Sequence, residues 1–205
     1  MLKVIIFDFD GVIADTFRMS LDILAERKRI IPKKIYRDFH EGNVYESPVL
    51  KFTKQESKNF WECYHARISE EHLFPIHEQI SKLSKRYKLF IISSSIESVI
   101  KKFLTITDLT KCFEEIFGRE AHKSKVEKFK IIFRKYGLKP QECIFVTDTL
   151  GDLREAKKVG VPTIAVTWGY HGKMRLKKGS PNIIIHDFDE LIPVVNKMKK
   201  YEKNH

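Results

Sequence analysis

Two aspartates separated by one residue stand at the end of an apolar run near the start of the chain. In the stretch IIFDFDGVIADT (residues 5–16), Asp8 and Asp10 follow the run, and Gly11 comes next. Residues two apart in an extended chain point to the same side, so both carboxylates should face one site. Burying two like charges costs free energy unless a cation or hydrogen-bond donors compensate. The pair therefore indicates a functional site.

More polar groups stand where other apolar runs end or a helical pattern begins: Ser93 to Ser95, Lys123 and Lys125, and Asp148 and Asp152. In an open α/β sheet, ligands bind at the carboxyl ends of the strands. Mg²⁺ prefers oxygen ligands, commonly carboxylates with phosphate oxygens, while a lysine and hydroxyl groups bind phosphoryl oxygens. The combination indicates a site for Mg²⁺ and a phosphate, with Asp8 placed to attack phosphorus.

Six apolar runs without polar alternation must position these groups: residues 3–7, 88–92, 114–117, 143–147, 162–167 and 182–186. Such runs, with helical patterns between most of them, are typical of a parallel sheet that is buried on both faces. The predicted fold class is therefore α/β, with a doubly wound, Rossmann-like parallel sheet as its core.

The interval between the first two runs is roughly 80 residues, far longer than one crossover helix requires. Its pattern is helical, and Thr53 with Glu56 has the spacing of a capping box. We expect a small helical cap, residues 16–75, inserted into a core made of residues 1–15 and 76–205. Within the cap, residues 40–48 are expected to reach the pocket and to set specificity.

Two further capping-box spacings bear on the site. Ser124 with Glu127 predicts a helix whose first turn contains Lys125, which favours Lys125 over Lys123 as the phosphate-binding lysine. Ser94 with Glu97 has the same spacing, so Ser94 is expected to cap a helix while its neighbour Ser93 faces the phosphate.

Four segments in order resemble the motifs of the haloacid dehalogenase superfamily of phosphohydrolases: DFDGVIADT, FIISSS, the lysine that opens a helix, and IFVTDTLGDLREA. A further segment, GVPTIAVTWGYH, resembles the phosphoglycolate-phosphatase-like branch. One Asp-x-Asp pair is a weak signal, but four ordered motifs over nearly the whole core are specific. The chain departs from the family at Thr147, where glycine is common, and at KSKVEKF, where lysine-proline is common.

The resemblance implies a role for each matched residue. Asp8 would be the nucleophile that forms an aspartyl-phosphate, and Asp10 would protonate the leaving alcohol and then activate water. Mg²⁺ would be held by Asp8, by Asp148 and by the backbone carbonyl of Asp10. Asp152 would orient the lysine or the metal-bound waters. The phosphoryl group would be bound by Gly11, Ser93, Ser94 and Lys125, with Ser93 and Lys125 also taking part in catalysis.

The implied function is a Mg²⁺-dependent phosphatase for a small phosphorylated metabolite, with phosphoglycolate as the default substrate by resemblance only. A phosphomutase of the beta-phosphoglucomutase type stays open as an alternative. Dehalogenase chemistry needs neither Asp10 nor a metal, so Asp10 argues against it. A phosphonate hydrolase would use a lysine of the cap. The cap contains several lysines, so the sequence excludes this function only weakly.

Composition and charge bear on nucleic-acid binding, redox state and localisation. The 205 residues carry 38 Lys and Arg against 27 Asp and Glu, a net charge of +11, but the basic residues are scattered along the chain. This favours a solvated surface over a nucleic-acid groove, and a basic nucleic-acid-binding protein is the less favoured alternative. The three cysteines read as free thiols. We expect a cytoplasmic protein with no membrane partner; the sequence does not indicate an oligomeric state.

Overall fold

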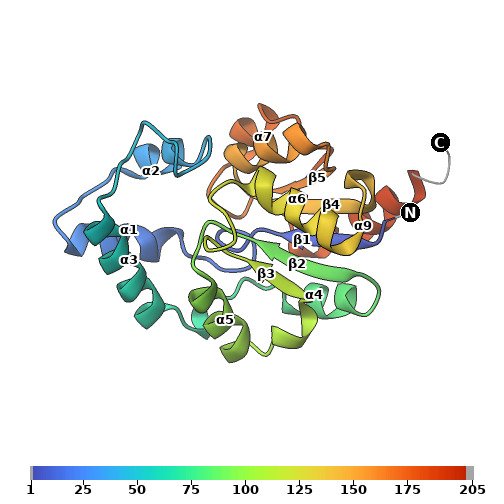
Figure 1. Cartoon of the computed structure of the whole chain (residues 1–205), viewed down its shortest axis with the longest axis horizontal. Helices are drawn as coiled ribbons and strands as arrows, with labels where there is room; N and C mark the ends of the chain where they lie inside the picture. Colours follow the sequence, from blue (N-terminus) through green and yellow to red (C-terminus); the bar gives the residue numbers. More distant parts are fainter. Residues whose placement is uncertain (1, 202–205) are drawn as a thin grey trace.

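A single six-stranded parallel sheet forms the centre of the computed structural model, which describes residues 2–201 (Figure 1). Its strands are β1 (Val4–Phe7), β2 (Lys88–Ile92), β3 (Glu115–Phe117), β4 (Cys143–Thr147), β5 (Thr163–Val166) and β6 (Ile183–Ile185). Their order in the sheet is β3-β2-β1-β4-β5-β6, and every neighbouring pair is parallel. The predicted α/β class is confirmed, and each strand lies inside its predicted apolar run.

Helices connect the strands. Those between β1 and β2 are α1 (Phe17–Glu26), α2 (Lys33–Phe39), α3 (Lys54–Arg67) and α4 (His77–Ser84). The later ones are α5 (Glu97–Ile106), α6 (Lys125–Tyr136), α7 (Leu150–Val159), α8 (Lys173–Lys177) and α9 (Leu191–Tyr201). Short 3₁₀ turns are η1 (Glu70–His72), η2 (Thr110–Cys112), η3 (Pro140–Glu142) and η4 (Phe188–Glu190).

The two faces of the sheet are buried by different helices. Along β1, Ile5 and Phe7 belong to the core cluster that includes side chains of α4, α5 and α9. Val4 and Ile6 belong to the cluster that includes side chains of α6 and α7. Both sides of the strand are therefore apolar, which explains why its sequence shows no alternation.

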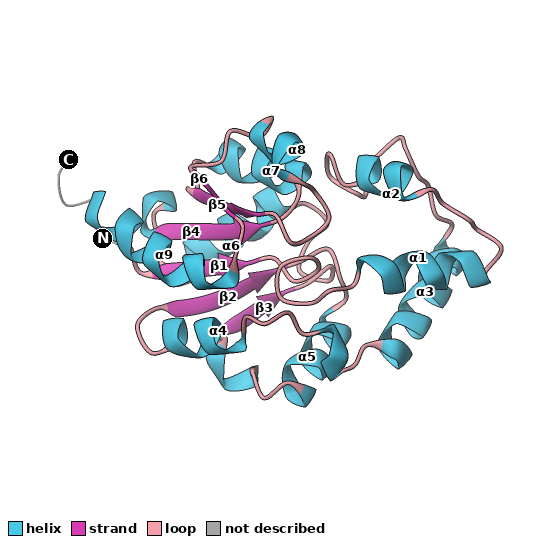
Figure 2. Ribbon diagram, turned by 180° about the vertical axis from the view of Figure 1, so that it is seen from behind, coloured by secondary structure: helices cyan, strands magenta, loops and turns pink. Residues whose placement is uncertain are grey.

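Helices α1, α2 and α3 lie together beyond the carboxyl ends of the strands, at the opposite end of the molecule from the two termini (Figures 1 and 2). The chain segments that lead into and out of this group run side by side. The Asp15 backbone N–H donates to the His72 carbonyl at 2.7 Å, and the Phe74 N–H donates to the Ile13 carbonyl at 3.1 Å. The chain segments on either side of α1, α2 and α3 are thus paired with each other.

The three predicted capping boxes had different outcomes. The Thr53 box is confirmed, because its hydroxyl accepts from the Glu56 N–H while the Glu56 side chain accepts from the Thr53 N–H. The Ser94 box was wrong. Helix α5 begins at Glu97 with Ile96 as its N-cap, and the Glu97 N–H donates to the Glu120 carboxylate at 3.0 Å.

The Ser124 box was also wrong, although α6 does begin at Lys125. The Ser124 hydroxyl donates to Glu155 of α7 at 3.0 Å, and Glu127 instead pairs with Lys130. Glu155 also accepts from the Lys125 N–H at 3.0 Å. A carboxylate from a neighbouring helix therefore occupies the N-terminus of α6, where the helix dipole favours negative charge.

The cysteines and the helix lengths complete the description of the fold. Cys63, Cys112 and Cys143 are free thiols, as predicted. Among residues 2–201, none of the helices combines the length and the apolar character that crossing a bilayer requires.

Candidate active site

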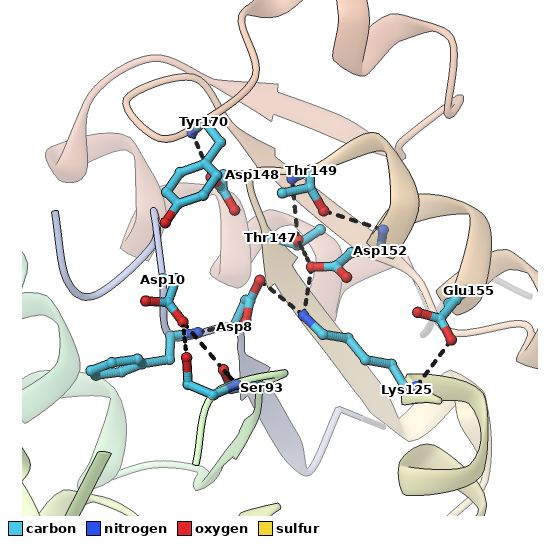
Figure 3. Close-up of polar contacts among 12 residues, drawn as sticks. Asp8, Asp10, Ser93, Lys125, Thr147, Asp148, Thr149, Asp152, Glu155 and Tyr170 are labelled. Atoms are coloured by element: carbon cyan, nitrogen blue, oxygen red, sulfur yellow. Dashed lines mark hydrogen bonds and ion pairs between the residues drawn. The ribbon is translucent and has the colours of Figure 1, made fainter. Parts of the chain in front are cut away.

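Neighbouring strands bring the predicted acidic groups to one edge of the sheet. Asp8 follows β1 and Asp148 follows β4, and these two strands are paired with Phe7 opposite Val146. The Asp8 N–H donates to the Val146 carbonyl at 2.9 Å, so the ladder continues one residue past β1. Ser93 follows β2 on the other side of β1. Figure 3 shows these side chains converging.

Lys125 is the basic group at the centre of the site. Its ammonium lies 2.9 Å from Asp8 Oδ2 and 2.6 Å from Asp152 Oδ2, and all three side chains are buried (Figure 3). Asp152 also accepts a hydrogen bond from the Thr147 hydroxyl at 2.7 Å. Lys123, the alternative from the sequence, is exposed and makes no contact with these acids. The geometry therefore favours Lys125 as the lysine of the site.

Burial and charge set the ionisation of this cluster. Burial raises the pKa of Asp8 well above its usual value, the Lys125 ammonium opposes that rise, and Asp152 adds to it. Burial also works against the ionised form of Asp152, but Lys125 and the hydrogen bonds lower its pKa to about 2. Although burial disfavours its charge, the carboxylates of Asp152 and Asp8 raise the pKa of Lys125. Lys125 is therefore charged, but its charge alone does not offset the effect of burial on Asp8.

Asp148 lies in a narrow slot made by two glycines. A Cβ atom on Gly11 would lie 2.0 Å from Asp148 Oδ2, and one on Gly169 would lie 2.2 Å from the same oxygen. Gly11 also has a φ of 76°, a conformation that favours glycine. The Gly11 N–H donates to the Ala14 carbonyl at 2.8 Å. The phosphate-binding role expected of Gly11 stays a prediction; the structure shows its N–H bonded to Ala14 and its missing side chain making room for Asp148.

One oxygen of Asp148 has a partner and the other does not. Oδ2 accepts from the Tyr170 N–H at 2.6 Å, whereas the buried Oδ1 has no hydrogen-bond partner within the protein. Burial raises the pKa of this carboxyl to about 8. A buried acceptor without a donor is costly, and a cation beside it would remove that cost and favour ionisation.

These residues fit the predicted Mg²⁺ ligands. Within the described residues, no three His, Cys, Asp or Glu side chains gather as a metal cluster. The predicted set requires only two carboxylates, Asp8 and Asp148, together with the backbone carbonyl of Asp10. A cation at this place would give the unpartnered Oδ1 of Asp148 a partner. It would also lower the raised pKa values of Asp8 and Asp148 and so favour their ionised forms.

Hydroxyl groups surround Asp10. Its Oδ1 accepts from Thr16 at 2.7 Å and from the Tyr64 hydroxyl, and its Oδ2 accepts from Ser95 at 2.5 Å. Tyr64 belongs to α3, so the insertion reaches the strand-end acids directly. Donors on both oxygens fix the orientation of the carboxylate and compensate its charge.

The serine segment after β2 is itself held in place. The buried Ser93 hydroxyl accepts from the Ser95 N–H at 3.0 Å and lies 3.5 Å from Asp10 Oδ2. The ammonium of Lys128, a second buried lysine on α6, donates to the Ser93 carbonyl. The half-buried Ser94 accepts through its carbonyl from the Tyr45 hydroxyl at 2.7 Å. This last bond ties the 40–48 segment to the sheet.

A cavity of about 660 Å³ opens from these residues into the insertion. Asp8, Asp10, Ser93, Ser94 and Lys125 line its inner end. The 40–48 segment lines it as well, as predicted from the sequence, through residues that include Asn43 and Tyr45. Asp148 and Gly11 lie outside the lining.

His171 is buried below this region and links two parts of the chain. Its Nδ1 accepts from the Leu150 N–H at 2.9 Å, so Nε2 carries the proton and donates to the Arg37 carbonyl at 2.8 Å. Burial lowers the pKa of His171 to about 4. The neutral ring therefore acts as a structural connector between α7 and the insertion.

Several residues of the site received no role from the sequence, although all but Tyr64 lie within the segments quoted for the motifs. They are Thr16, Tyr64, Ser95, Lys128, Glu155 and Tyr170. Only Ser95 stands beside a predicted site residue and could have been found by spacing. Thr16, Tyr64 and Tyr170 bond the acids directly, whereas Lys128 bonds the Ser93 carbonyl and Glu155 bonds the Lys125 N–H, and each of these contacts depends on tertiary packing.

Residues 5–166 match the family model described as haloacid dehalogenase-like hydrolase. Among curated proteins, the phosphoglycolate phosphatases of Escherichia coli (strain K12) and Salmonella choleraesuis are each 23% identical over 145 residues. The matched region covers 67% of this chain but 58% of each relative, so the chain spans less than two thirds of their length.

Solved structures share the fold along nearly the whole chain. A haloacid dehalogenase-like hydrolase from Streptococcus pneumoniae superposes with a TM-score of 0.79 at 24% identity, covering 95% of this chain and 98% of its own. A protein from Clostridium acetobutylicum, described as a predicted phosphatase, gives a TM-score of 0.80 at 19% identity, covering 96% and 99%. At these identities the similarity establishes the architecture.

Proposed function

Because this chain belongs to the haloacid dehalogenase-like hydrolase family, we propose that it is a Mg²⁺-dependent phosphatase acting on a phosphate monoester through an aspartyl-phosphate. The observation that carries the proposal is the arrangement of Asp8 and Asp10 at one end of a cavity, with the Lys125 ammonium 2.9 Å from Asp8. A nucleophile, a cation and a second carboxylate are the groups that phosphoryl transfer requires.

In the first step, a carboxylate oxygen of Asp8 bonds to phosphorus while the bond from phosphorus to the ester oxygen breaks. Asp10 gives its proton to that oxygen, so the alcohol leaves neutral. Lys125 and the Ser93 hydroxyl bind phosphoryl oxygens and offset their charge. Bound Mg²⁺ would supply charge neutralisation beside Asp8 and Asp148.

In the second step, water attacks phosphorus, its proton passes to Asp10, and phosphate leaves as Asp8 is restored to a carboxylate. Asp152 keeps Lys125 in place through the 2.6 Å ion pair. Residues 16–75 act as the cap that excludes bulk water during both steps, and residues 1–15 and 76–205 act as the core. The paired connection at Asp15 and His72 supports that division.

Rapid-quench labelling with a ³²P-labelled ester tests the two acids separately. Asp8→Asn keeps the shape of the side chain but removes the attacking charge, so no phosphoenzyme should form. Asp10→Asn keeps the nucleophile but loses the acid and the base, so turnover should fall by about 10²–10⁴-fold.

With a good leaving group such as p-nitrophenyl phosphate, the first step in Asp10→Asn should recover and acid-stable phosphoenzyme should accumulate. Labelled phosphoenzyme in Asp8→Asn would refute the assignment. Product analysis separates the phosphatase from a phosphomutase, which would return the phosphoryl group to a sugar phosphate instead of releasing inorganic phosphate.

A further inference from the structure

Beyond the acids, part of the cavity wall is made of aromatic and aliphatic side chains of the insertion, beside polar and charged ones. Phe60 and Trp61 from α3 line it, as do Leu50 and Phe52 from the segment before α3. All four are half-buried, so part of each faces the cavity space. Phe52 packs edge-on against Phe39 of α2 with ring centroids 6.0 Å apart, which fixes its position in the wall.

This apolar wall begins directly at Asp10. The Tyr64 hydroxyl bonds Asp10, while the Tyr64 ring lies 5.3 Å from the ring of Trp61 and 5.6 Å from that of Phe60, centroid to centroid. In the proposed reaction, on which this inference rests, Asp10 protonates the ester oxygen. The alcohol part of the substrate must therefore extend from Asp10 along these rings.

Two basic groups of the cavity lie beside Tyr45, away from the rings of Phe60 and Trp61 in the sequence. The Arg119 guanidinium and the Lys123 ammonium are each 5.9 Å from the centre of the Tyr45 ring, and Tyr45 bonds the Ser94 carbonyl. These cations therefore lie near the serine segment that faces the phosphoryl group. Lys51 and Lys54 also line the cavity, but both are exposed to solvent.

The size and polarity of the cavity argue against a very small acid as the substrate. At about 660 Å³ it lies within the roughly 300–1,000 Å³ range of pockets that hold drug-sized ligands. A two-carbon acid such as phosphoglycolate would leave most of the apolar wall in contact with water. Its carboxylate would also lie beside Tyr64 and Trp61, where desolvating a charge is unfavourable.

We propose that the substrate is the phosphate monoester of an alcohol that carries an aromatic ring. The phosphoryl end binds at Asp8, Ser93 and Lys125, and the ring packs against Phe52, Phe60 and Trp61. Stacked and edge-on contacts between rings add to the burial of apolar surface. Specificity then resides in the insertion, whereas the chemistry resides at the strand ends.

Phenethyl phosphate and ethyl phosphate form a matched pair that tests this proposal. Both release a primary alcohol, so their intrinsic reactivities are similar, and they differ in the ring. We expect kcat/KM to be about 10- to 100-fold higher for phenethyl phosphate, as burial of one ring would give. Phosphoglycolate should also be slower than phenethyl phosphate.

Variants locate the ring. Phe52→Ala and Leu50→Ala should each lower the phenethyl-to-ethyl ratio of kcat/KM, since each removes part of the wall. Phe133→Ala is the matched control, because Phe133 is a half-buried phenylalanine on α6 outside the cavity lining, and it should leave the ratio as in the wild type. Circular dichroism confirms that each variant is folded.

The outcomes separate this proposal from the phosphatase assignment. Hydrolysis of p-nitrophenyl phosphate with ethyl phosphate or phosphoglycolate favoured over phenethyl phosphate would overturn the ring proposal and leave the phosphatase intact. An unchanged ratio in both wall variants would overturn it too. If no ester is hydrolysed, p-nitrophenyl phosphate included, both proposals fail.

Discussion

The hydroxyl of Tyr64 in α3 donates a hydrogen bond to Asp10, which precedes it by 54 residues and stands at the end of β1. This bond joins the insertion to the acid that is proposed to protonate the leaving group. The orientation of the Asp10 carboxylate therefore depends in part on the placement of α3.

Tyr64→Phe should slow turnover of alkyl phosphates by about 10- to 100-fold, because a hydrogen bond to a charged group contributes about 1.5–3 kcal/mol. The loss should be smaller for p-nitrophenyl phosphate, which needs little protonation, and a purely structural role would not produce that difference. Tyr136→Phe is the matched control, since Tyr136 donates to the Glu115 carboxylate at 2.7 Å outside the cavity lining. Steady-state kinetics with both esters makes the measurement, and equal losses would contradict the role.

Replacing Lys125 should damage both activity and stability. Lys125→Ala leaves Asp8 and Asp152 buried without their cation, and removing one partner of a buried ion pair costs about 3–5 kcal/mol. Lys125→Met keeps the length of the side chain and should also be inactive. Lys123→Ala, at an exposed position, should be milder. Urea unfolding and turnover measure the two effects, and a greater loss in Lys123→Ala would show that the wrong lysine was assigned.

Mg²⁺ should stabilise the fold as well as support turnover. Burial raises the pKa values of Asp8 and Asp148, and a cation that binds both would favour their ionised forms. A ligand that binds only the folded state raises the free energy of unfolding by about 2.7 kcal/mol at a concentration 100-fold above its Kd. Thermal unfolding should shift upward with Mg²⁺ in the wild type and much less in Asp148→Asn. Full turnover after exhaustive EDTA treatment would exclude the metal role.

Acid should weaken the fold through His171. Its pKa is about 4 in the folded protein and about 6.5 in the unfolded chain, so the folded state favours the neutral ring. The stabilisation is complete above pH 6.5 and is lost as pH falls towards 4, which amounts to about 2 kcal/mol between pH 8 and 5. His171→Asn keeps an acceptor for the Leu150 N–H but does not titrate.

The free energy of unfolding should therefore fall less with acid in His171→Asn than in the wild type. His65→Asn, at an exposed histidine, serves as the control and should follow the wild type. The same pH dependence in wild type and His171→Asn would rule out this contribution.

The strands could be predicted because each is a local property of the sequence. A run such as CIFVT at 143–147 is apolar on both faces, and the structure places it at the centre of the sheet with helices on both sides. The polar residues that end these runs follow the same logic. Asp8 and Asp148 meet because β1 and β4 are neighbours, and carboxyl ends of parallel strands share one edge.

The capping of α6 and the surroundings of Asp10 could not be predicted in this way. Ser124 and Glu127 have the spacing of a capping box, but Glu155 from another helix satisfies the Ser124 hydroxyl and the Lys125 N–H instead. In the sequence, Tyr64 is one apolar position of a helical pattern. Its ring is indeed buried among other rings. Its hydroxyl reaches Asp10 only when α3 is packed against α1 and α5.

The paired connection between the sheet and the insertion has a consequence for how such a protein can be altered. Ala14 precedes α1 and Leu73 follows α3, and these two residues form an antiparallel bridge. The ends of the inserted segment are therefore adjacent, so exchanging it for another segment with adjacent ends leaves the order and spacing of the strands unchanged. Such an exchange would replace the part of the cavity wall that lies between Ala14 and Leu73 and would keep the strand-end acids.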